Sequence, residues 1–600
     1  MSLGEIASTL KQKVRGRLAL PTGHLARLAA RLAARVREAL STREGQALAA
    51  MVAGGAILRL LFLGGESLWL DEAFSVTISR RGLLDLLRMV VRTDAHPPLY
   101  YLVLKLWMGF GSSETHVRLL SALFSIAAIP VMYAVAVALY GDRRIGLLSA
   151  LILAISPFQI WYAQEARMYA MLTFLVLLSA YFYIRALQDG EPRDWAGYSI
   201  ATALALYTDN GAIWYLGVVA LFYLLSLRSF PGRFLGWFVS NAGVVLMYML
   251  WVPSLLWQTA RVTENFWLPP PTFQTVLGTF LDFLSFNFPL VELGLLYMAL
   301  ILVWAYIVPG RDWQRRLLSL WLFLPLVISL SLSLRQPIFL SRNLIIASLG
   351  FALLIASTIW RFRSRTATLV LLLPLVVMNL VSVVYNLGWE QKEDWRAVAR
   401  HVARATMKKP GGLVVFLPSY AEIPFTYYFE QSGVPIDTQG YPTDEVLLHP
   451  QPRQAADFDA LLGGHPYVWL VVGDVSTADA DWTVKNWLDT HGYIRQQDLV
   501  RDSLTVMTYV RWDKYTPTTA ASASYGPQIY LPLVGGKPPL QDHEVKPGET
   551  LLEIAVRYRT TIQFLMDIND LSNPNEIEAG QEIQVPLVFE DNSSSGTPYP

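Results

Sequence analysis

The sequence predicts a polytopic α-helical membrane protein that continues into an extracytoplasmic α/β domain and a small C-terminal domain. Hydrophobic residues make up 53% of the 600 residues and charged residues only 16%, whereas a soluble globular chain carries about 25% charged residues. About 11 apolar runs approach the ~20 residues that a membrane-spanning helix needs. The stretch from residue 389 onward lacks such runs, so it is expected to lie outside the bilayer.

The apolar runs all lie between residues 46 and 388. They cover approximately 46–64, 118–140, 145–161, 168–187, 195–209, 212–228, 234–257, 291–309, 317–334, 343–360 and 367–388, and because several adjoin, the count extends up to 13. The stretch Pro97–Phe110 is apolar but only 14 residues long. We therefore expect it to lie in the membrane interface rather than to cross.

Charge in the short loops predicts the orientation. The tail 1–45 carries nine Lys and Arg against three acids, so it is expected to be cytoplasmic. Alternate short loops are also basic, and the long first outer loop, 65–117, is the exception. These features predict a multi-pass protein of the plasma membrane whose C-terminal domains, from residue 389, are extracytoplasmic.

The C-terminal region divides by composition and pattern. Residues 389–514 are expected to form the α/β domain, with 515–542 as a linker rich in Thr, Ala, Ser, Gly and Pro. Residues 543–586 form a compact piece and 587–600 a polar tail. Within the α/β domain, helices are predicted at Glu393–Met407 and Trp482–Thr490, and strands at Leu413–Leu417, Val468–Val472 and Leu504–Val510.

Several functions are excluded or disfavoured by what the sequence lacks. With no Cys, the chain has no disulfide, iron–sulfur cluster or Cys-ligated zinc. It has no P-loop, no Gly-rich dinucleotide turn and no HExxH motif, which disfavours a nucleotide-driven pump. The net charge of +1 gives no pull toward nucleic acid. Nucleotide sugars are absent from the outer face of a membrane. Chemistry at that face would therefore need a substrate already activated on a lipid.

Ionisable residues next to a membrane are costly, so each is a functional candidate. Asp71 and Glu72 follow the first span, where a carboxylate can act as a general base. The alternative is a solvated loop or a helix N-terminus that favours acids. His96 can bind metal or phosphate or shuttle a proton, although a single His is more often structural.

Two further outer junctions carry charged residues. Glu165 and Arg167 either pair with each other or contribute to binding. Arg335 and Arg342 flank a short segment where arginines can hold a lipid phosphate, and the alternative is that their side chains only snorkel to the interface.

Five segments in order, WLDEAF, HPPLYY, RLLSALFS, QEARMYA and SRN, resemble the bacterial branch of glycosyltransferase family 39. This branch is similar to protein O-mannosyltransferases and lipid A aminoarabinose transferases, and the resemblance covers roughly residues 45–515, with EDWRAVARHV typical of bacterial relatives. It implies a GT-C fold for residues 46–388. It also implies inverting transfer of a hexose or pentose from a polyprenyl-phosphate donor to a hydroxyl of a protein, lipid or glycan on the outer face.

The resemblance also implies roles for individual residues. Asp71 is the expected base and Glu72 orients it or the acceptor. Residues expected to bind the donor and its phosphate are His96, Lys105, Glu165, Arg167, Arg335 and Arg342. Asn343 stands where the family usually has Tyr after the Arg. The resemblance establishes no cofactor, and a divalent metal is left open because its use varies among relatives.

Residues 543–586 resemble a LysM domain, which implies a βααβ fold and binding to N-acetylglucosamine glycans, usually peptidoglycan. The residues expected to form the groove are Gly548, Glu549, Thr550, Leu551, Asn573, Pro574, Asn575 and Ile577. Leu552 and Arg559 depart from the common Trp and Gly. On the residues alone, a small polar domain whose Asn and Gly only form turns is the alternative.

Two other classes of function fit parts of the sequence. A polyprenyl-linked sugar transporter or flippase would use many spans, but it often shows internal repeats, and none is visible between the two halves. A non-catalytic cell-wall anchor would not need the ionisable residues at the outer junctions.

Overall fold

The computed structural model divides into two compact units, residues 1–66 with 75–391 and residues 67–74 with 392–600. The described residues are 34, 37, 38, 40–263, 270–307, 312–362, 364–388, 392–441, 458, 462, 465–473, 482–496, 498–501, 504–511, 514, 540–546, 549–558, 565, 566, 568, 569, 571, 573 and 577–586. Most of the predicted basic tail, the linker and the polar tail lie outside them.

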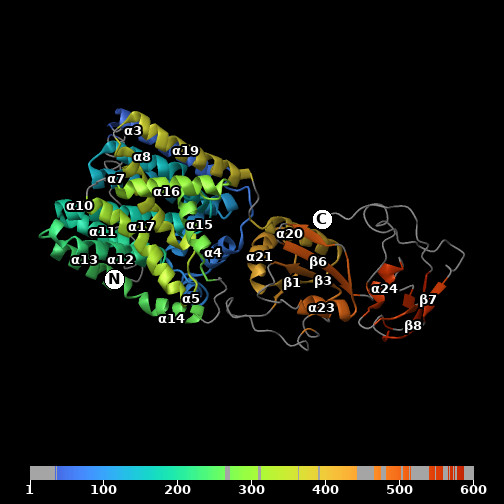
Figure 1. Ribbon diagram of the computed structural model, residues 1–600. Helices are drawn as coiled ribbons and strands as arrows, with labels where there is room; N and C mark the ends of the chain where they lie inside the picture. The colour runs from blue at the N-terminus through green and yellow to red at the C-terminus, as the bar shows by residue number, and fades with distance from the viewer. Residues whose placement is uncertain are drawn as a thin grey trace, which may run out of the picture. The chain divides into compact units, whose positions relative to one another are not determined.

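The first unit is helical (Figure 1), and each of the apolar runs lies on a helix or on a bent helix pair. These helices are α3 (Arg43–Leu60), α7 (Glu114–Tyr140), α8 (Arg143–Ile155), α9 (Pro157–Ala163), α10 (Tyr169–Asp189), α11 (Pro192–Thr208), α12 (Ala212–Leu225), α13 (Phe234–Tyr248), α14 (Val252–Thr263), α16 (Val291–Ile307), α17 (Asp312–Ser333), α18 (Ile345–Trp360) and α19 (Arg365–Gly388). The predicted polytopic helical architecture is confirmed.

Helix length and composition give a smaller number of candidate membrane spans than the apolar runs of the sequence. Within the described residues, five helices are long and apolar enough to cross a membrane, or seven if each of two pairs, bent by 57° and 64°, forms one span. The apolar helices α12 and α16 have only 14 and 17 residues. The prediction of about 11 spans therefore stays a prediction.

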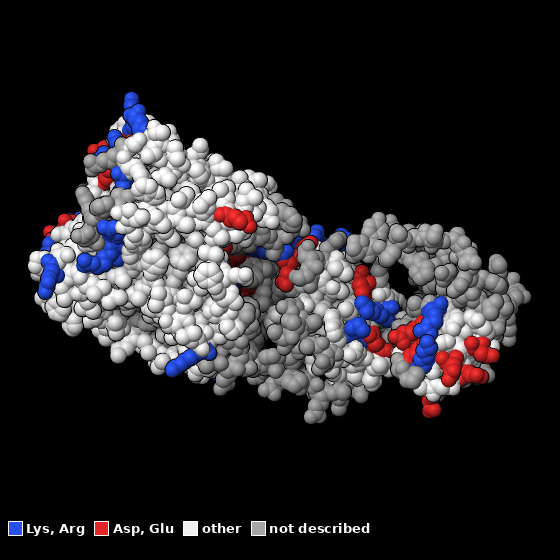
Figure 2. Space-filling model, in the orientation of Figure 1, with Lys and Arg blue, Asp and Glu red and all other residues white. Residues whose placement is uncertain are grey.

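Burial separates the helices into a centre and a periphery. In α18 every residue from Ile345 to Ile359 is buried, as expected for a helix that is apolar on all sides and surrounded by others. By contrast α13, α16 and α19 expose large apolar side chains such as Leu246, Leu300 and Leu373. Figure 2 shows a broad, nearly uncharged face on this unit. An apolar surface of this kind suits a lipid environment.

Shorter helices join the long ones near the candidate residues. They are α4 (Leu70–Arg80), α5 (Leu83–Thr93), α6 (Leu99–Trp107), the 3-10 turn η1 (Met108–Phe110) and α15 (Phe273–Ser285). Helix α6 begins directly after Pro97–Pro98 and, with η1, ends within 12 residues. It is thus too short to cross a bilayer, in agreement with the expectation from the sequence.

The second unit contains a six-stranded sheet within its described residues, in the order β2-β1-β3-β6-β4 with β5 also paired to β6. The strands are β1 (Leu413–Leu417), β2 (Asp437–Gly440), β3 (Tyr467–Val472), β4 (Tyr493–Arg495), β5 (Leu499–Arg501) and β6 (Leu504–Arg511). Strands β1, β2 and β3 are parallel and β6 is antiparallel to β3. Alternate side chains of β1 enter two separate cores, with Val415 in one and Val414 in the other.

Helices cover both faces of this sheet. Helix α20 (Trp395–Lys408) contributes Val398 and Val402 to one core, together with α21 (Glu422–Phe429). Helix α23 (Thr483–Thr490) contributes Trp487 to the other. The expected helices and strands of this region are all present, with ends that differ by at most two residues. Strands β2, β4 and β5 and helix α21 were not anticipated.

The C-terminal piece has strands β7 (Leu540–Glu544) and β8 (Glu582–Pro586) in antiparallel register, with His543 opposite Ile583. Helix α24 (Leu551–Arg557) packs Leu551 and Ile554 into a small core. Most of the expected second helix lies outside the described residues.

Candidate functional site

The two candidate catalytic carboxylates lie in the first turn of α4. Acids are stabilised there because the exposed N–H groups of a helix start carry partial positive charge. Glu72 is fully buried, and its carboxylate lies 3.4 Å from the Lys392 ammonium, whose side chain is 8% exposed. Asp71 is partly exposed, which suits a group that must reach a substrate. Lys392 was not singled out from the sequence.

The chain just before α4 is held by the start of the α/β domain. The Ser67 hydroxyl donates to the Glu393 carbonyl and accepts the Trp395 N–H at 3.2 Å. The Tyr428 hydroxyl accepts the Leu68 N–H at 2.6 Å. The WLDEAF segment therefore belongs to the same compact unit as the EDWRAVARHV segment, although more than 300 residues separate them in the sequence.

A buried polar network supports the middle of α4 within the first unit. Arg167 is 4% exposed, and one of its guanidinium nitrogens lies 3.3 Å from the Ser75 hydroxyl and 3.4 Å from the Tyr101 hydroxyl. Tyr101 donates in turn to the carboxylate of Asp94, which is 7% exposed. Ser75 lies one helical turn after Asp71. The predicted donor-binding Arg167 thus braces the carboxylate helix.

Lys105 also contacts α4, but at its far end. Its ammonium donates to the carbonyls of Ser79 at 3.3 Å and Arg81 at 2.6 Å. A cation at this place stabilises a helix C-terminus. The expected contact of Lys105 with the donor stays a prediction.

His96 is paired with an acid that was not singled out from the sequence. Its Nδ1 lies 3.2 Å from Oδ2 of Asp209, and both side chains are at most 20% exposed. The two atoms are close but not aligned for a hydrogen bond, so they form an ion pair only when the imidazole is protonated. The neighbouring Asn210 amide donates to the Ala95 carbonyl at 2.7 Å, which fastens the two loops.

A second polar group forms around Tyr162, at the ends of α9 and α15. The charged residues Glu165, Arg342 and Asp282 all lie near Tyr162. Burial raises the pKa of Asp282 to about 6, and a hydrogen bond with Ser341 opposes this shift. Asp282 was not singled out from the sequence. Arg335 is exposed, and its side chain has no polar contact with the part of the chain that is described.

These loops bring most of the predicted donor residues together within the first unit. The backbone oxygen of Asn343 would lie 3.4 Å from a Cβ atom placed on Gly211. The segment after Arg342 therefore lies next to the loop after α11, which carries Asp209, the residue next to His96. No group of three or more His, Asp or Glu able to hold a metal ion occurs among the described residues.

In the C-terminal piece, several predicted groove residues are used internally. The Glu549 side chain is 6% exposed and accepts from His543 Nε2 at 2.9 Å and from the Lys546 N–H at 3.0 Å. It also pairs with Arg557. Although burial acts to raise the pKa of Glu549, these partners lower it to about 2.

The other predicted groove residues fall into four groups. Thr550 forms a reciprocal capping box with Glu553 at the start of α24. Leu551 is a core residue and Ile577 packs against that core. Asn573 is exposed. Gly548, Pro574 and Asn575 lie outside the described residues.

Comparison with known families agrees with this architecture. Residues 95–257 match the family described as dolichyl-phosphate-mannose-protein mannosyltransferase, and residues 543–586 match the LysM domain. Two crystal structures of ArnT from Cupriavidus metallidurans, one bound to undecaprenyl phosphate and one in the apo state, are similar in fold. They superpose with TM-scores of 0.55 and 0.54 at 16% identity, over 78% of this chain and 98% of ArnT.

The relatives found by sequence align with a smaller part of the chain than ArnT does. An uncharacterised protein of Aquifex aeolicus is 28% identical over 170 residues, and an endolysin of Bacillus phage PZA is 46% identical over 52 residues. The alignments span 34% and 19% of those two proteins, and 28% and 8% of this chain. The chain therefore combines a helical domain of GT-C fold, whose residues 95–257 match the dolichyl-phosphate-mannose-protein mannosyltransferase family, with C-terminal residues 543–586 that match the LysM domain.

Proposed function

We propose that this protein is an inverting glycosyltransferase that moves a sugar from a polyprenyl-phosphate donor to an acceptor hydroxyl on the outer face of the plasma membrane. The observation that carries the proposal is the pair of acids in the first turn of α4, with Glu72 buried against Lys392 and Asp71 partly exposed. The undecaprenyl phosphate bound to ArnT, a protein of the same fold, supports a lipid-phosphate donor.

In this proposal Asp71 is the general base. It takes the proton of the acceptor hydroxyl while the hydroxyl oxygen attacks the anomeric carbon and the bond from that carbon to the phosphate oxygen breaks. Configuration inverts because attack and departure occur on opposite faces. Arg342 stabilises the negative charge that develops on the leaving polyprenyl phosphate. Glu72 pairs with Lys392 and fixes the orientation of the helix start.

The LysM domain, in the same proposal, holds the enzyme at peptidoglycan or a similar glycan. With the side chains of Glu549, Thr550 and Leu551 engaged internally, we expect main-chain groups of the turn at 548–551 and of the segment 571–577 to contact the sugar. The excess of Lys and Arg in residues 1–45 supports a cytoplasmic N-terminus and therefore an external LysM domain.

The test is sugar transfer by the purified full-length protein in lipid nanodiscs. Wild type, Asp71→Asn and the matched control Asp85→Asn are supplied with a panel of polyprenyl-phosphate sugars and hydroxyl acceptors. Asp85 is an exposed acid of α5 that pairs with Arg88. We expect Asp71→Asn alone to lose at least ~100-fold in rate, the usual contribution of a general base. Equal rates for all three proteins contradict the assignment, and translocation of the sugar lipid without transfer identifies a flippase.

A further inference from the structure

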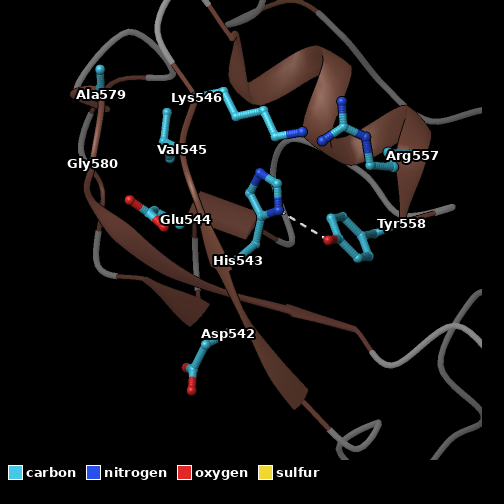
Figure 3. Close-up of a pocket in the computed structure, with 9 residues that line it drawn as sticks. All are labelled: Asp542, His543, Glu544, Val545, Lys546, Arg557, Tyr558, Ala579 and Gly580. Atoms are coloured by element: carbon cyan, nitrogen blue, oxygen red, sulfur yellow. Dashed lines mark hydrogen bonds between the residues drawn. The ribbon is translucent and has the colours of Figure 1, made fainter.

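Two cavities within the described residues differ in the charges that line them. In the LysM domain, Asp542 and Glu544 line a cavity together with Lys546 and Arg557 (Figure 3), so positive and negative charges offset each other there. The other cavity, of about 470 Å³, lies in the helical unit between the end of α16 and the start of α17, and we refer to it as the α16–α17 cavity. The residues that line it are Tyr306, Arg315, Arg316, Ser319 and Leu320. Two arginines without an acid in this lining favour an anion.

The surroundings of the α16–α17 cavity are basic as well. In the sequence, residues 311–316 contain three Arg and one acid, and residues 361–365 contain three Arg and no acid. Arg361 lies near Arg315, and its Nη1 donates to the Ala305 carbonyl close to the end of α16 at 3.1 Å. Figure 2 shows Lys and Arg side chains gathered at the left end of the helical unit, beside its broad uncharged face. Six arginines against one acid in these two segments leave an excess of positive charge.

Arg316 is held in a fixed orientation by the end of α12. Its Nη1 donates to the Leu225 carbonyl at 2.8 Å and to the Ser226 hydroxyl at 3.0 Å. A guanidinium has five N–H donors, and Nη1 supplies only two of them. The donors on Nε and Nη2 have no hydrogen-bond partner in the part of the chain that is described, and the side chain is partly exposed. These two nitrogens form the edge with which an arginine binds two oxygens of one phosphate.

Two hydroxyls add donors at the same place. The Tyr306 and Ser319 hydroxyl oxygens lie 2.9 Å apart and bridge α16 and α17 at the cavity. In such a pair one hydroxyl donates to the other, so the hydrogen of the accepting hydroxyl remains for an external acceptor. The cavity therefore offers both charged and neutral donors to the oxygens of an anion.

Exposed apolar side chains adjoin the cavity along α16. Ile307 is 71% exposed, Val303 52% and Leu300 48%, and all three lie within two turns of Tyr306. A free phosphate would leave these side chains uncovered, whereas the acyl chains of a lipid cover them. The neighbourhood of a basic cavity and an apolar helix face thus fits a molecule that carries an anionic head and hydrocarbon chains.

We propose that the α16–α17 cavity binds the headgroup of an anionic phospholipid, with its phosphate on Arg315 and Arg316 and its acyl chains along α16. A zwitterionic lipid has the same phosphate, but these arginines repel the cation of its headgroup. The excess of Lys and Arg predicts that this end is cytoplasmic, where anionic lipids attract basic residues. None of the residues expected to bind the sugar donor lines the cavity, so the inference does not depend on sugar transfer.

The experiment measures lipid binding to the full-length protein in a neutral detergent by native mass spectrometry. Phosphatidylglycerol, phosphatidylcholine with the same acyl chains and inorganic phosphate are titrated separately. Wild type is compared with Arg315→Gln, Arg316→Gln and the matched control Arg143→Gln, at an exposed arginine that starts α8 and does not line the cavity. We expect wild type and the control to bind phosphatidylglycerol at least fivefold more tightly than phosphatidylcholine. Each cavity variant should lose about fivefold in affinity for phosphatidylglycerol alone, the contribution of one arginine near an anionic lipid.

Arg315→Gln keeps the hydrogen bonds that hold the end of α12, so it tests the cavity even if Arg316→Gln does not fold. Equal affinity of wild type for the two lipids overturns the proposal. An equal loss in Arg143→Gln and in the cavity variants also overturns it, because general attraction to a basic surface then explains the binding. Displacement of phosphatidylglycerol by an equal concentration of inorganic phosphate overturns the lipid in favour of a free anion.

Discussion

His96 and Asp209 are paired at 3.2 Å, and this pair joins the loop before α6 to the loop after α11. The Asn210 amide reinforces the junction through the Ala95 carbonyl. An imidazole beside a carboxylate keeps a fixed position and can carry positive charge toward a phosphate. The sequence indicated His96 but not the acid that positions it.

We predict that His96 and Asp209 act as one unit. Asp209→Asn and His96→Gln should each raise the donor KM, and the double variant should lose less than the sum of both effects, with a coupling of about 1 kcal/mol. Steady-state kinetics with a polyprenyl-phosphate sugar measures the cycle. Asp189→Asn, at an acid whose side chain is 52% exposed, is the control and should leave KM unchanged. Strict additivity would show that the two groups act independently.

The Glu72–Lys392 pair leads to a second prediction. Lys392→Met leaves a fully buried carboxylate without its cation, and removing one partner of a buried pair costs about 3–5 kcal/mol. We expect a lower thermal midpoint and a loss of transfer, both measured on full-length protein. Glu72→Gln combined with Lys392→Met should restore part of the stability but not the activity. A Lys392→Met protein as stable as the exposed-site control Lys408→Met would contradict the assignment.

The raised pKa of Asp282 leads us to predict that donor binding depends on pH. Its pKa is raised to about 6, so the fold favours the neutral form. The corresponding stabilisation is complete below the ordinary value of 3.8 and is lost as the pH rises through about 6. Above that pH a new negative charge lies in the same polar group as Arg342 and weakens its attraction for phosphate.

The donor KM of wild type should therefore rise between pH 5 and 7, over roughly one to two pH units centred on the Asp282 pKa. Asp282→Asn should remove this rise. Ser341→Ala should shift the rise to higher pH, because the hydrogen bond that opposes the effect of burial is lost. A profile that Asp282→Asn leaves unchanged assigns the ionisation to another group.

The lowered pKa of Glu549 predicts the opposite pH dependence for the stability of the LysM domain. Its pKa falls to about 2 from an ordinary 4.5, so its contribution to stability is present above 4.5 and is lost as the pH drops toward 2. Hydrogen exchange of peptides from 540–558 should show reduced protection for Glu549→Gln near neutral pH and little difference from wild type near pH 2. Glu553→Gln, at an exposed acid of α24, separates this effect from that of the capping box. Equal protection of wild type and Glu549→Gln near neutral pH would argue against a structural role for this carboxylate.

The helices could be predicted because their signal is local. A long apolar run such as 118–140 must form a helix in a bilayer, since every backbone polar group has to be satisfied within the segment. Strand β1 was predicted from five consecutive apolar residues that are buried on both faces. Strands β2 and β4 are short and partly exposed, so no comparable pattern marks them.

The partners of the candidate residues could not be predicted in the same way. Asp71, Glu72 and His96 stand out because they are ionisable groups near apolar runs. Lys392 and Asp209 have ordinary local surroundings, and their importance comes only from contacts across hundreds of residues. Asp209 did offer one signal, since it ends an apolar run at a junction on the predicted outer side.

The hydrogen bonds of Ser67 and Leu68 to residues after 392 bear on how far the protein is modular. A chain cut after residue 391 would keep every predicted span and both acids of α4, yet it would lack Lys392, Trp395 and Tyr428. Grafting a foreign outer domain onto the same spans would have the same effect unless these three groups were transplanted with it. We therefore expect a cut at the boundary that is visible in the sequence to remove the partners that hold the segment before α4.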